Sequence, residues 1–268
     1  MQKPIGVKHT LKIVNVRKMI NLQMFNPDVL DCGYTEILPA LKYAVDVMRA
    51  IGIGELMSKP EKMPEWSFNI PAKTCKVGRH LVWKKGSNCY KCYALEGHYR
   101  NSIVQAALER RYRFAVHNPN FIPAMTFLIN LRVKRRFRWF DSGDIQSEKM
   151  LDDICQICRN TPHILHWLPT KEHKMVKRYI YSGKKIPDNL DLRLSSHFKS
   201  KTSVHRVTKL ARRLGLNTAT VLPPNEWDKF IASKSKGIRC PSSTQDNECG
   251  ECEACWVHKV VNVGYKWH

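Results

Sequence analysis

Seven of the ten cysteines in this 268-residue chain lie in two short segments, at spacings that suit a soft metal centre. They are Cys75, Cys89 and Cys92 in the first segment, and Cys240, Cys249, Cys252 and Cys255 in the second. Two thiolates separated by two residues can turn toward the same side of the backbone and bind one centre together. We therefore predict that both segments bind metal.

The second segment favours an iron–sulfur cluster over a zinc ion. Cys249, Cys252 and Cys255 follow one another at two-residue gaps, and Cys240 supplies a fourth thiolate. Structural zinc sites usually use two separated cysteine pairs, whereas three closely spaced thiolates are typical of a [4Fe–4S] cluster. We expect a [4Fe–4S] cluster here, with zinc as the alternative metal.

The first segment supplies three cysteines and leaves open which fourth group completes the site. Its three thiolates can hold a second cluster with one open iron, or they can join the C-terminal set at a single site. A third alternative is zinc bound together with a histidine such as His80 or His98. An open iron would leave room for a second ligand, so the first alternative is the one that permits catalysis.

The remaining cysteines have simpler interpretations. Cys155 and Cys158 form a further CxxC pair inside a predicted helix, where we expect them to face the core as small apolar side chains. Cys32 is isolated and receives no role.

Alternating strands and helices predict the fold that must position these groups. We expect strands at 66–70, 137–140, 163–168, 190–194 and 218–222, and helices at 93–116, 121–132, 147–160, 172–182 and 202–214. A further strand is expected at 9–17 and a further helix at 35–51. Strands connected by helices form parallel sheets, whose carboxyl edges gather functional groups.

Polar side chains follow the predicted strands directly. Asp141, Ser142, Gly143 and Asp144 come after one strand, Thr170 and Lys171 after the next, and Ser195, Ser196 and His197 after the third. Because these ends meet at one edge of a parallel sheet, we expect them to contribute to a common site.

The charge of the chain points to a polyanionic partner. Its 45 Lys and Arg residues against 23 Asp and Glu residues give a formal net charge of +22 at pH 7, for which nucleic acid is the usual partner.

No long apolar run predicts a membrane span, and the N-terminus lacks the apolar core of a signal peptide. We expect a cytoplasmic protein, and the sequence leaves its oligomeric state open. Walker, Rossmann and Gly-x-Ser-x-Gly motifs are absent, which disfavours the common NTPases, dehydrogenases and hydrolases.

Three motifs together resemble an uncharacterised bacteriophage gene-product family over roughly residues 64–258. They read Thr74-Cys75…Cys89-x-x-Cys92-Tyr-Ala, Arg138-Trp-Phe-Asp141-Ser-Gly-Asp144 and Cys240-Pro…Cys249-Gly-x-Cys252-x-x-Cys255-Trp256. The combination is also similar to radical S-adenosylmethionine (radical SAM) enzymes. The resemblance implies an α/β fold, a partial parallel (β/α) barrel of radical-SAM type with cysteine-rich metal-binding loops, working in an infected host cell.

The resemblance also implies one or two [4Fe–4S] clusters and S-adenosylmethionine bound at the strand ends. Asp141, Ser142, Gly143 and Asp144 would bind this ligand, with the two carboxylates holding its amino group, and Ser195 and His197 would face the substrate. The chain departs from the radical-SAM pattern in two places. Thirteen residues separate Cys75 from Cys89 where that family has three, and Asp141-Ser-Gly-Asp144 replaces a Gly-Gly-Glu segment.

These features predict three segments and two alternative functions. Residues 1–63 would form an N-terminal extension packing on the barrel, residues 64–235 the partial barrel with the first cysteine cluster, and residues 236–268 the C-terminal cluster segment. The leading function is a radical-SAM-like iron–sulfur protein acting on nucleic acid or nucleotides. The alternative is a non-enzymatic basic protein, stapled by iron–sulfur clusters or zinc, that binds nucleic acid or a protein partner.

Overall fold

The computed structural model describes residues 55–61, 63–222, 226 and 237–266. The strand predicted at 9–17, the helix predicted at 35–51 and Cys32 lie outside these residues.

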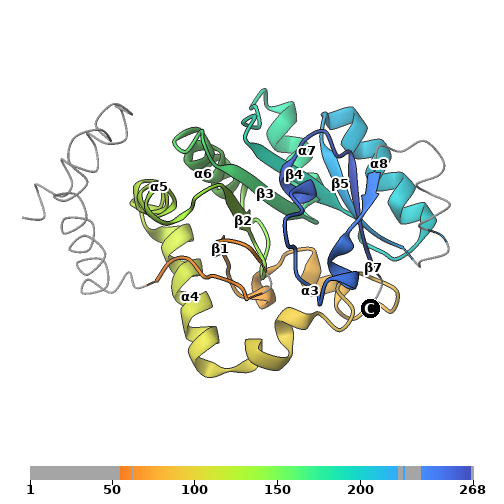
Figure 1. The fold of residues 1–268 in the computed structure, drawn as a ribbon, viewed down its shortest axis with the longest axis horizontal. Coiled ribbons are helices and arrows are strands. Elements are labelled where there is room, and N and C mark those ends of the chain that lie inside the picture. Colours follow the sequence, from red (N-terminus) through yellow and green to blue (C-terminus); the bar gives the residue numbers. More distant parts are fainter. Residues whose placement is uncertain (1–54, 62, 223–225, 227–236, 267–268) are drawn as a thin grey trace, which may run out of the picture.

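A seven-stranded parallel sheet forms the centre of the molecule (Figure 1). Its strands are β1 (Ser67–Phe68), β2 (Arg136–Trp139), β3 (Leu165–Thr170), β4 (Leu190–Ser195), β5 (Asn217–Leu222), β6 (Gly237–Arg239) and β7 (Asn262–Lys266). They lie in the order β1-β2-β3-β4-β5-β7-β6, and every neighbouring pair is parallel. The predicted α/β class and parallel sheet are confirmed. The sheet is open, because β1 and β6 form its two edges.

The structure contains the α-helices and 3-10 helices given below, and the bounds of the α-helices after residue 120 agree closely with the prediction. The α-helices are α3 (Gly78–Leu81), α4 (Ser102–His117), α5 (Phe121–Arg132), α6 (Glu148–Arg159), α7 (His173–Tyr181) and α8 (Lys201–Leu214). Short 3-10 helices are η2 (Ala72–Thr74), η3 (Tyr93–Leu95), η4 (Gly97–Arg100), η5 (Pro241–Thr244) and η6 (Ala254–Trp256).

The helix predicted at 93–116 is wrong in its first third. Two 3-10 helices, η3 and η4, occupy that part of the chain, and Gly97, the first residue of η4, has a left-handed φ of 53°. Helix α4 begins only after Asn101, whose side chain accepts a hydrogen bond from the backbone N–H of Ile103 at 2.8 Å. Asparagine is among the strongest N-capping residues, so the local sequence starts the helix there.

The C-terminal segment contributes two strands that the sequence pattern did not predict. Strand β7 lies between β5 and β6, so residues 237–266 extend the main sheet as well as carrying the second cysteine set. Strand β6 is only three residues long, and Gly264 weakens the strand signal of β7, so neither is evident from the local sequence. Pairing with β5 supplies the stability that their own composition lacks.

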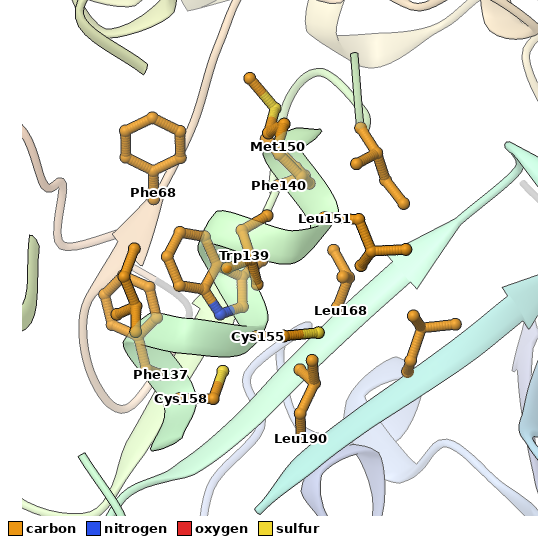
Figure 2. Close-up of a cluster of buried hydrophobic side chains, with 14 of the residues drawn as sticks. Phe68, Phe137, Trp139, Phe140, Met150, Leu151, Cys155, Cys158, Leu168 and Leu190 are labelled. Atoms are coloured by element: carbon orange, nitrogen blue, oxygen red, sulfur yellow. The ribbon is translucent and has the colours of Figure 1, made fainter. Parts of the chain in front are cut away.

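The two faces of the sheet pack against different parts of the chain. Successive residues in a strand point to opposite faces. In β3, Leu168 belongs to the large hydrophobic cluster with helices α5 to α8, whereas Trp167 belongs to a smaller cluster with the C-terminal cysteines. Figure 2 shows Cys155 and Cys158 inside the large cluster beside Leu168 and Leu190. Both cysteines are fully buried, which confirms their predicted place in the core.

Candidate metal centres at two cysteine sets

The first cysteine set lies at the carboxyl edge of the sheet. The backbone N–H of Val77 donates to the Glu172 carboxylate after β3 at 2.8 Å. The N–H of Asn88 donates to the carbonyl oxygen of His197 after β4, also at 2.8 Å. These bonds tie the segment between Cys75 and Cys89 to the ends of two neighbouring strands, where the parallel topology predicts a functional site.

The sulfurs of Cys75 and Cys89 converge on the backbone of Gly78. A Cβ atom on Gly78 would lie 3.6 Å from the Cys75 Sγ, 3.7 Å from the Cys89 Sγ and 2.9 Å from the Cys75 Cβ. The missing side chain therefore leaves a cradle between the two sulfurs, which any other residue would fill. Such a cradle is the kind of space in which thiolates can share one centre.

Burial raises the pKa values of two thiols of the first set, Cys75 and Cys89. Burial raises the pKa of Cys75 well above its usual range, and Asp144, Cys92 and Cys89 raise it further, whereas Lys171 lowers it. Burial also raises the pKa of Cys89, with Cys92 adding to the effect. Without a cation the thiols of Cys75 and Cys89 therefore stay protonated, and a bound metal ion would favour their thiolate forms.

Asp144 holds two strand ends together from inside the protein. Its Oδ1 accepts hydrogen bonds from the Ile145 N–H at 2.8 Å and the Thr170 hydroxyl at 2.6 Å, and its Oδ2 accepts one from the Lys171 N–H at 2.9 Å. The carboxylate is buried, and burial raises its pKa. Asp144 thus lies beside the first cysteine set, as predicted for this edge, with its oxygens already hydrogen-bonded.

The other residues of the segment after β2 also have internal partners. Asp141 accepts a hydrogen bond from the Tyr99 hydroxyl at 2.5 Å and pairs with Arg138 at 2.9 Å. The Ser142 hydroxyl donates to the Ile70 carbonyl oxygen at 2.9 Å. Gly143 has a left-handed φ of 89°, which permits the sharp turn between the two aspartates.

Ser195 and His197 lie at the same edge, next to a histidine that the sequence did not single out. The rings of His173 and His197 stack at 4.2 Å. The Nε2 of His173 lies 2.8 Å from the Ser195 carbonyl oxygen, and that of His197 lies 2.9 Å from the Lys171 carbonyl oxygen. Burial lowers the pKa of both rings, that of His173 to about 4. In the neutral rings the Nε2 atoms carry the hydrogens, so the Nδ1 atoms keep their lone pairs.

The second cysteine set packs against the face of the sheet that carries Trp167. Its four members pack in the smaller hydrophobic cluster: Cys240, Cys249, Cys252 and Cys255. The Cys255 Sγ lies 3.1 Å from the Tyr265 hydroxyl, and the Cys240 Sγ lies 3.2 Å from the Ser242 hydroxyl. Burial raises the pKa of Cys255 to about 12, and the neighbouring Cys240 and Cys249 contribute. The second set therefore has hydrogen-bonding neighbours of its own, Tyr265 and Ser242.

Arg193 in β4 positions the second set and was missed by sequence reasoning. Its fully buried guanidinium donates to the carbonyl oxygens of Ala254 at 2.8 Å and Cys255 at 3.2 Å, and pairs with Asp191 at 2.6 Å. The signal was present in the strand Leu-Asp-Leu-Arg-Leu, where two charges alternate with leucines. That alternation indicates a buried polar face.

Arg138 lies between the two sets. It stacks over the Trp167 ring at 4.5 Å, and Asp141, Tyr93 and Cys255 lie within electrostatic range of its guanidinium. Tyr93 directly follows Cys92 in the first set, and Cys255 belongs to the second. The arginine therefore connects the carboxyl edge of the sheet with the face that holds the C-terminal cysteines.

Neither set has the side-chain arrangement of a loaded site. Among the described residues, no group of three or more His, Cys, Asp or Glu side chains is arranged so that it could hold a metal ion as it stands. The structure brings the predicted ligands of each set into one neighbourhood, and metal binding stays a prediction.

Comparison with known proteins identifies a family and nothing closer. A family model described as Gene product 88 matches residues 48–258. No curated protein and no solved structure matches the chain. Within the described part of the chain, no helix has the length and apolar character needed to cross a membrane.

Proposed function

The chain belongs to the gene product 88 family, and we propose that it is a radical-SAM-like iron–sulfur protein that acts on nucleic acid or nucleotides. One observation carries the proposal. Cys75, Cys89 and Cys92 gather at the carboxyl edge of an open parallel sheet, where α/β enzymes place their reactive groups. Three thiolates leave one position of a four-iron cluster without a protein ligand.

The chemistry of the residues at this edge supports the proposal. The cradle above Gly78 brings two sulfurs together, and Lys171 supplies a positive charge that favours thiolates. A bound cluster would supply the electron for reductive cleavage of S-adenosylmethionine. Asp141 would bind the cationic end of that ligand, and Ser195 and His197 would face the substrate from the neighbouring strand end. Asp144, which is buried and bonded to Thr170 and Lys171, would hold the two strand ends in place.

Metal analysis of protein purified without oxygen tests the first half of the proposal. Two clusters predict about eight iron and eight sulfide ions per chain, with absorbance near ~400 nm, since each cubane contains four of each. Replacing Cys75, Cys89 and Cys92 together by alanine should remove about half of the iron. The matched control replaces Cys155 and Cys158 by alanine, which should leave the iron content unchanged because these thiols lie in the core. A colourless protein containing only zinc would contradict the proposal.

The second half requires an activity assay on the same protein. After chemical reduction, the wild type should cleave S-adenosylmethionine to 5′-deoxyadenosine, and the triple alanine variant of the first set should not. Iron-loaded wild type that never cleaves the ligand, with or without nucleic acid, would show that the clusters are structural.

A non-enzymatic function is the second candidate, and the C-terminal set favours it. Cys240, Cys249, Cys252 and Cys255 can complete a four-ligand site by themselves, and Arg193 holds their loop on the sheet. A fully ligated centre binds no substrate and would act as a staple for β6 and β7. Spectra of the reduced cluster separate the candidates, because S-adenosylmethionine should change the signal of an open iron and leave a closed one unchanged.

A further inference from the structure

We propose that residues 76–91 form a binding site for single-stranded nucleic acid, with Trp83 as the platform on which a base stacks. This site deepens the proposed function, because it would hold the polymer directly over the first cysteine set. It rests on the exposure of Trp83, the order of its loop, the surrounding charge and the position of the loop.

Trp83 is far more exposed than an indole normally is. It is 85% exposed, whereas Trp139, Trp167 and Trp256 are buried. A large apolar ring left in water gains free energy when another flat ring covers it, and a nucleic-acid base offers such a face.

The loop that carries Trp83 is held in place on both sides of the ring. The Lys84 N–H donates to the Leu81 carbonyl oxygen at 2.9 Å, and the Ser87 hydroxyl donates to the same oxygen at 2.6 Å. The Asn88 side chain donates to the Ser196 carbonyl oxygen at 2.5 Å. The indole is therefore presented by an ordered turn, so little conformational entropy is lost when a base stacks on it.

The charged residues of the loop that carries Trp83 are all basic. The thirteen residues between Cys75 and Cys89 contain four Lys or Arg residues and no Asp or Glu, and Lys91 follows. Arg79, Lys84 and Lys85 are exposed, and none of them forms an ion pair with another residue that the structure describes. An exposed aromatic ring among free cations is the arrangement that binds unpaired bases and their phosphates together.

The position of the loop connects this binding to the cysteines. Trp83 lies between Cys75 and Cys89, and the loop is bonded to the strand end that carries Ser196 and His197. A strand stacked on Trp83 would therefore run along the carboxyl edge of the sheet. The thirteen-residue gap, which departs from the radical-SAM spacing, would be the substrate-binding insertion of this chain.

A membrane surface fits the same region less well. An exposed indole with lysines can also insert into anionic lipid, but surface-binding segments present a long amphipathic helix. Helix α3 in this loop is only four residues long and ends before Trp83.

Fluorescence anisotropy with labelled oligonucleotides tests the site. Anaerobically purified full-length protein is titrated with oligo-dT, oligo-U and a duplex of the same length. We expect tighter binding to the single strands, and Trp83→Ala should weaken it at least about fivefold, the lower end of what stacking one base contributes. Trp83→Phe should retain most of the affinity. The matched control is Tyr181→Ala, which removes a 64% exposed aromatic ring from α7 near Lys177 and should leave binding unchanged.

A pair of double variants separates this site from diffuse charge attraction. Lys84→Ala with Lys85→Ala should weaken binding several-fold more than Arg212→Ala with Arg213→Ala, an exposed basic pair on α8. Equal losses in the two doubles, or full affinity in Trp83→Ala, would overturn the inference. Trp83-dependent binding to anionic vesicles without oligonucleotide binding would assign the loop to membranes instead. Iron is measured on the same samples, so iron-free protein that still binds through Trp83 would overturn only the proposed function.

Discussion

His166 in β3 is a fully buried imidazole whose ionisation opposes folding. Its Nε2 lies 2.9 Å from the Thr161 hydroxyl, and its Nδ1 has no hydrogen-bond partner among the described residues. Burial lowers the pKa of the ring from its usual 6.5 to about 3. The folded protein therefore keeps this ring neutral over a range in which the unfolded chain binds a proton.

The stability of the protein should consequently fall as the pH drops below about 6.5, since the unfolded state gains protons there and the folded state does not. From pH 6.5 to pH 5 this single group should cost about 2 kcal/mol of unfolding free energy. Urea unfolding of wild type and His166→Leu at several pH values measures the difference. The variant should lose the part of the acid sensitivity that His166 contributes, while the buried rings of His173 and His197 keep theirs. His205→Leu, at an exposed position on α8, should keep the wild-type pH dependence. Identical pH dependence in His166→Leu and wild type would contradict this explanation.

The turn after β2 shows why the segment between Asp141 and Asp144 needs a glycine. A Cβ on Gly143 would lie 2.2 Å from the Ile70 Cγ1 and 2.9 Å from the Ile70 carbonyl oxygen, so the turn packs directly on the strand-end backbone. Its φ of 89° is also unfavourable for any other residue. The glycine therefore brings Asp144 into contact with β3 while the chain reverses direction.

Replacing Gly143 by alanine should be much more destabilising than the same change at Gly183. Gly183 has a similar φ of 84°, and its Cβ would meet nothing within 4 Å. Gly183→Ala should cost about 1–2 kcal/mol from backbone strain alone. Gly143→Ala adds the steric overlap and should cost at least about 2 kcal/mol more. Thermal and urea unfolding compare the two variants, and equal losses would show that the close approach to Ile70 relaxes easily.

Buried polar contacts attach the C-terminal segment to the sheet at the scale of the whole molecule. Arg193 donates to backbone carbonyl oxygens of the segment containing Cys255, and the Trp256 indole N–H donates to the Phe137 carbonyl oxygen at 3.0 Å. Strand β7 then pairs with β5. The second cysteine set is therefore part of the same folding unit as the sheet.

Arg193→Met should destabilise the protein by about 3–5 kcal/mol, because it leaves the Asp191 carboxylate buried without its partner. Adding Asp191→Leu should recover part of that loss. Arg178→Met is the matched control, since its ion pair with Glu148 is exposed and should be worth less than about 1 kcal/mol. Under the proposed iron–sulfur function, the iron bound by the second set should fall in Arg193→Met even at temperatures where the protein stays folded. Unchanged iron content would show that the cysteine loop orders itself without the arginine.

Local sequence was sufficient to predict the elements between residues 121 and 222. Ser147 caps α6 by accepting from the Met150 N–H at 3.0 Å, and Gly215, with a left-handed φ of 67°, ends α8. Both signals act between residues close in the chain, so they are readable from the sequence. Three sequence motifs likewise pointed to the bacteriophage gene-product family that the family model matches.

Only the tertiary structure decided how those elements and residues combine. Strand β7 lies between β5 and β6 in the folded sheet. The Asp144 carboxylate accepts hydrogen bonds from Thr170 and Lys171, and Trp83 stays exposed beside the first cysteine set. Such outcomes depend on contacts between segments far apart in the chain, whose register is set by packing. The helix or strand propensity of a short segment carries no information about this packing, because the position of each segment depends on the positions of all the segments that it contacts.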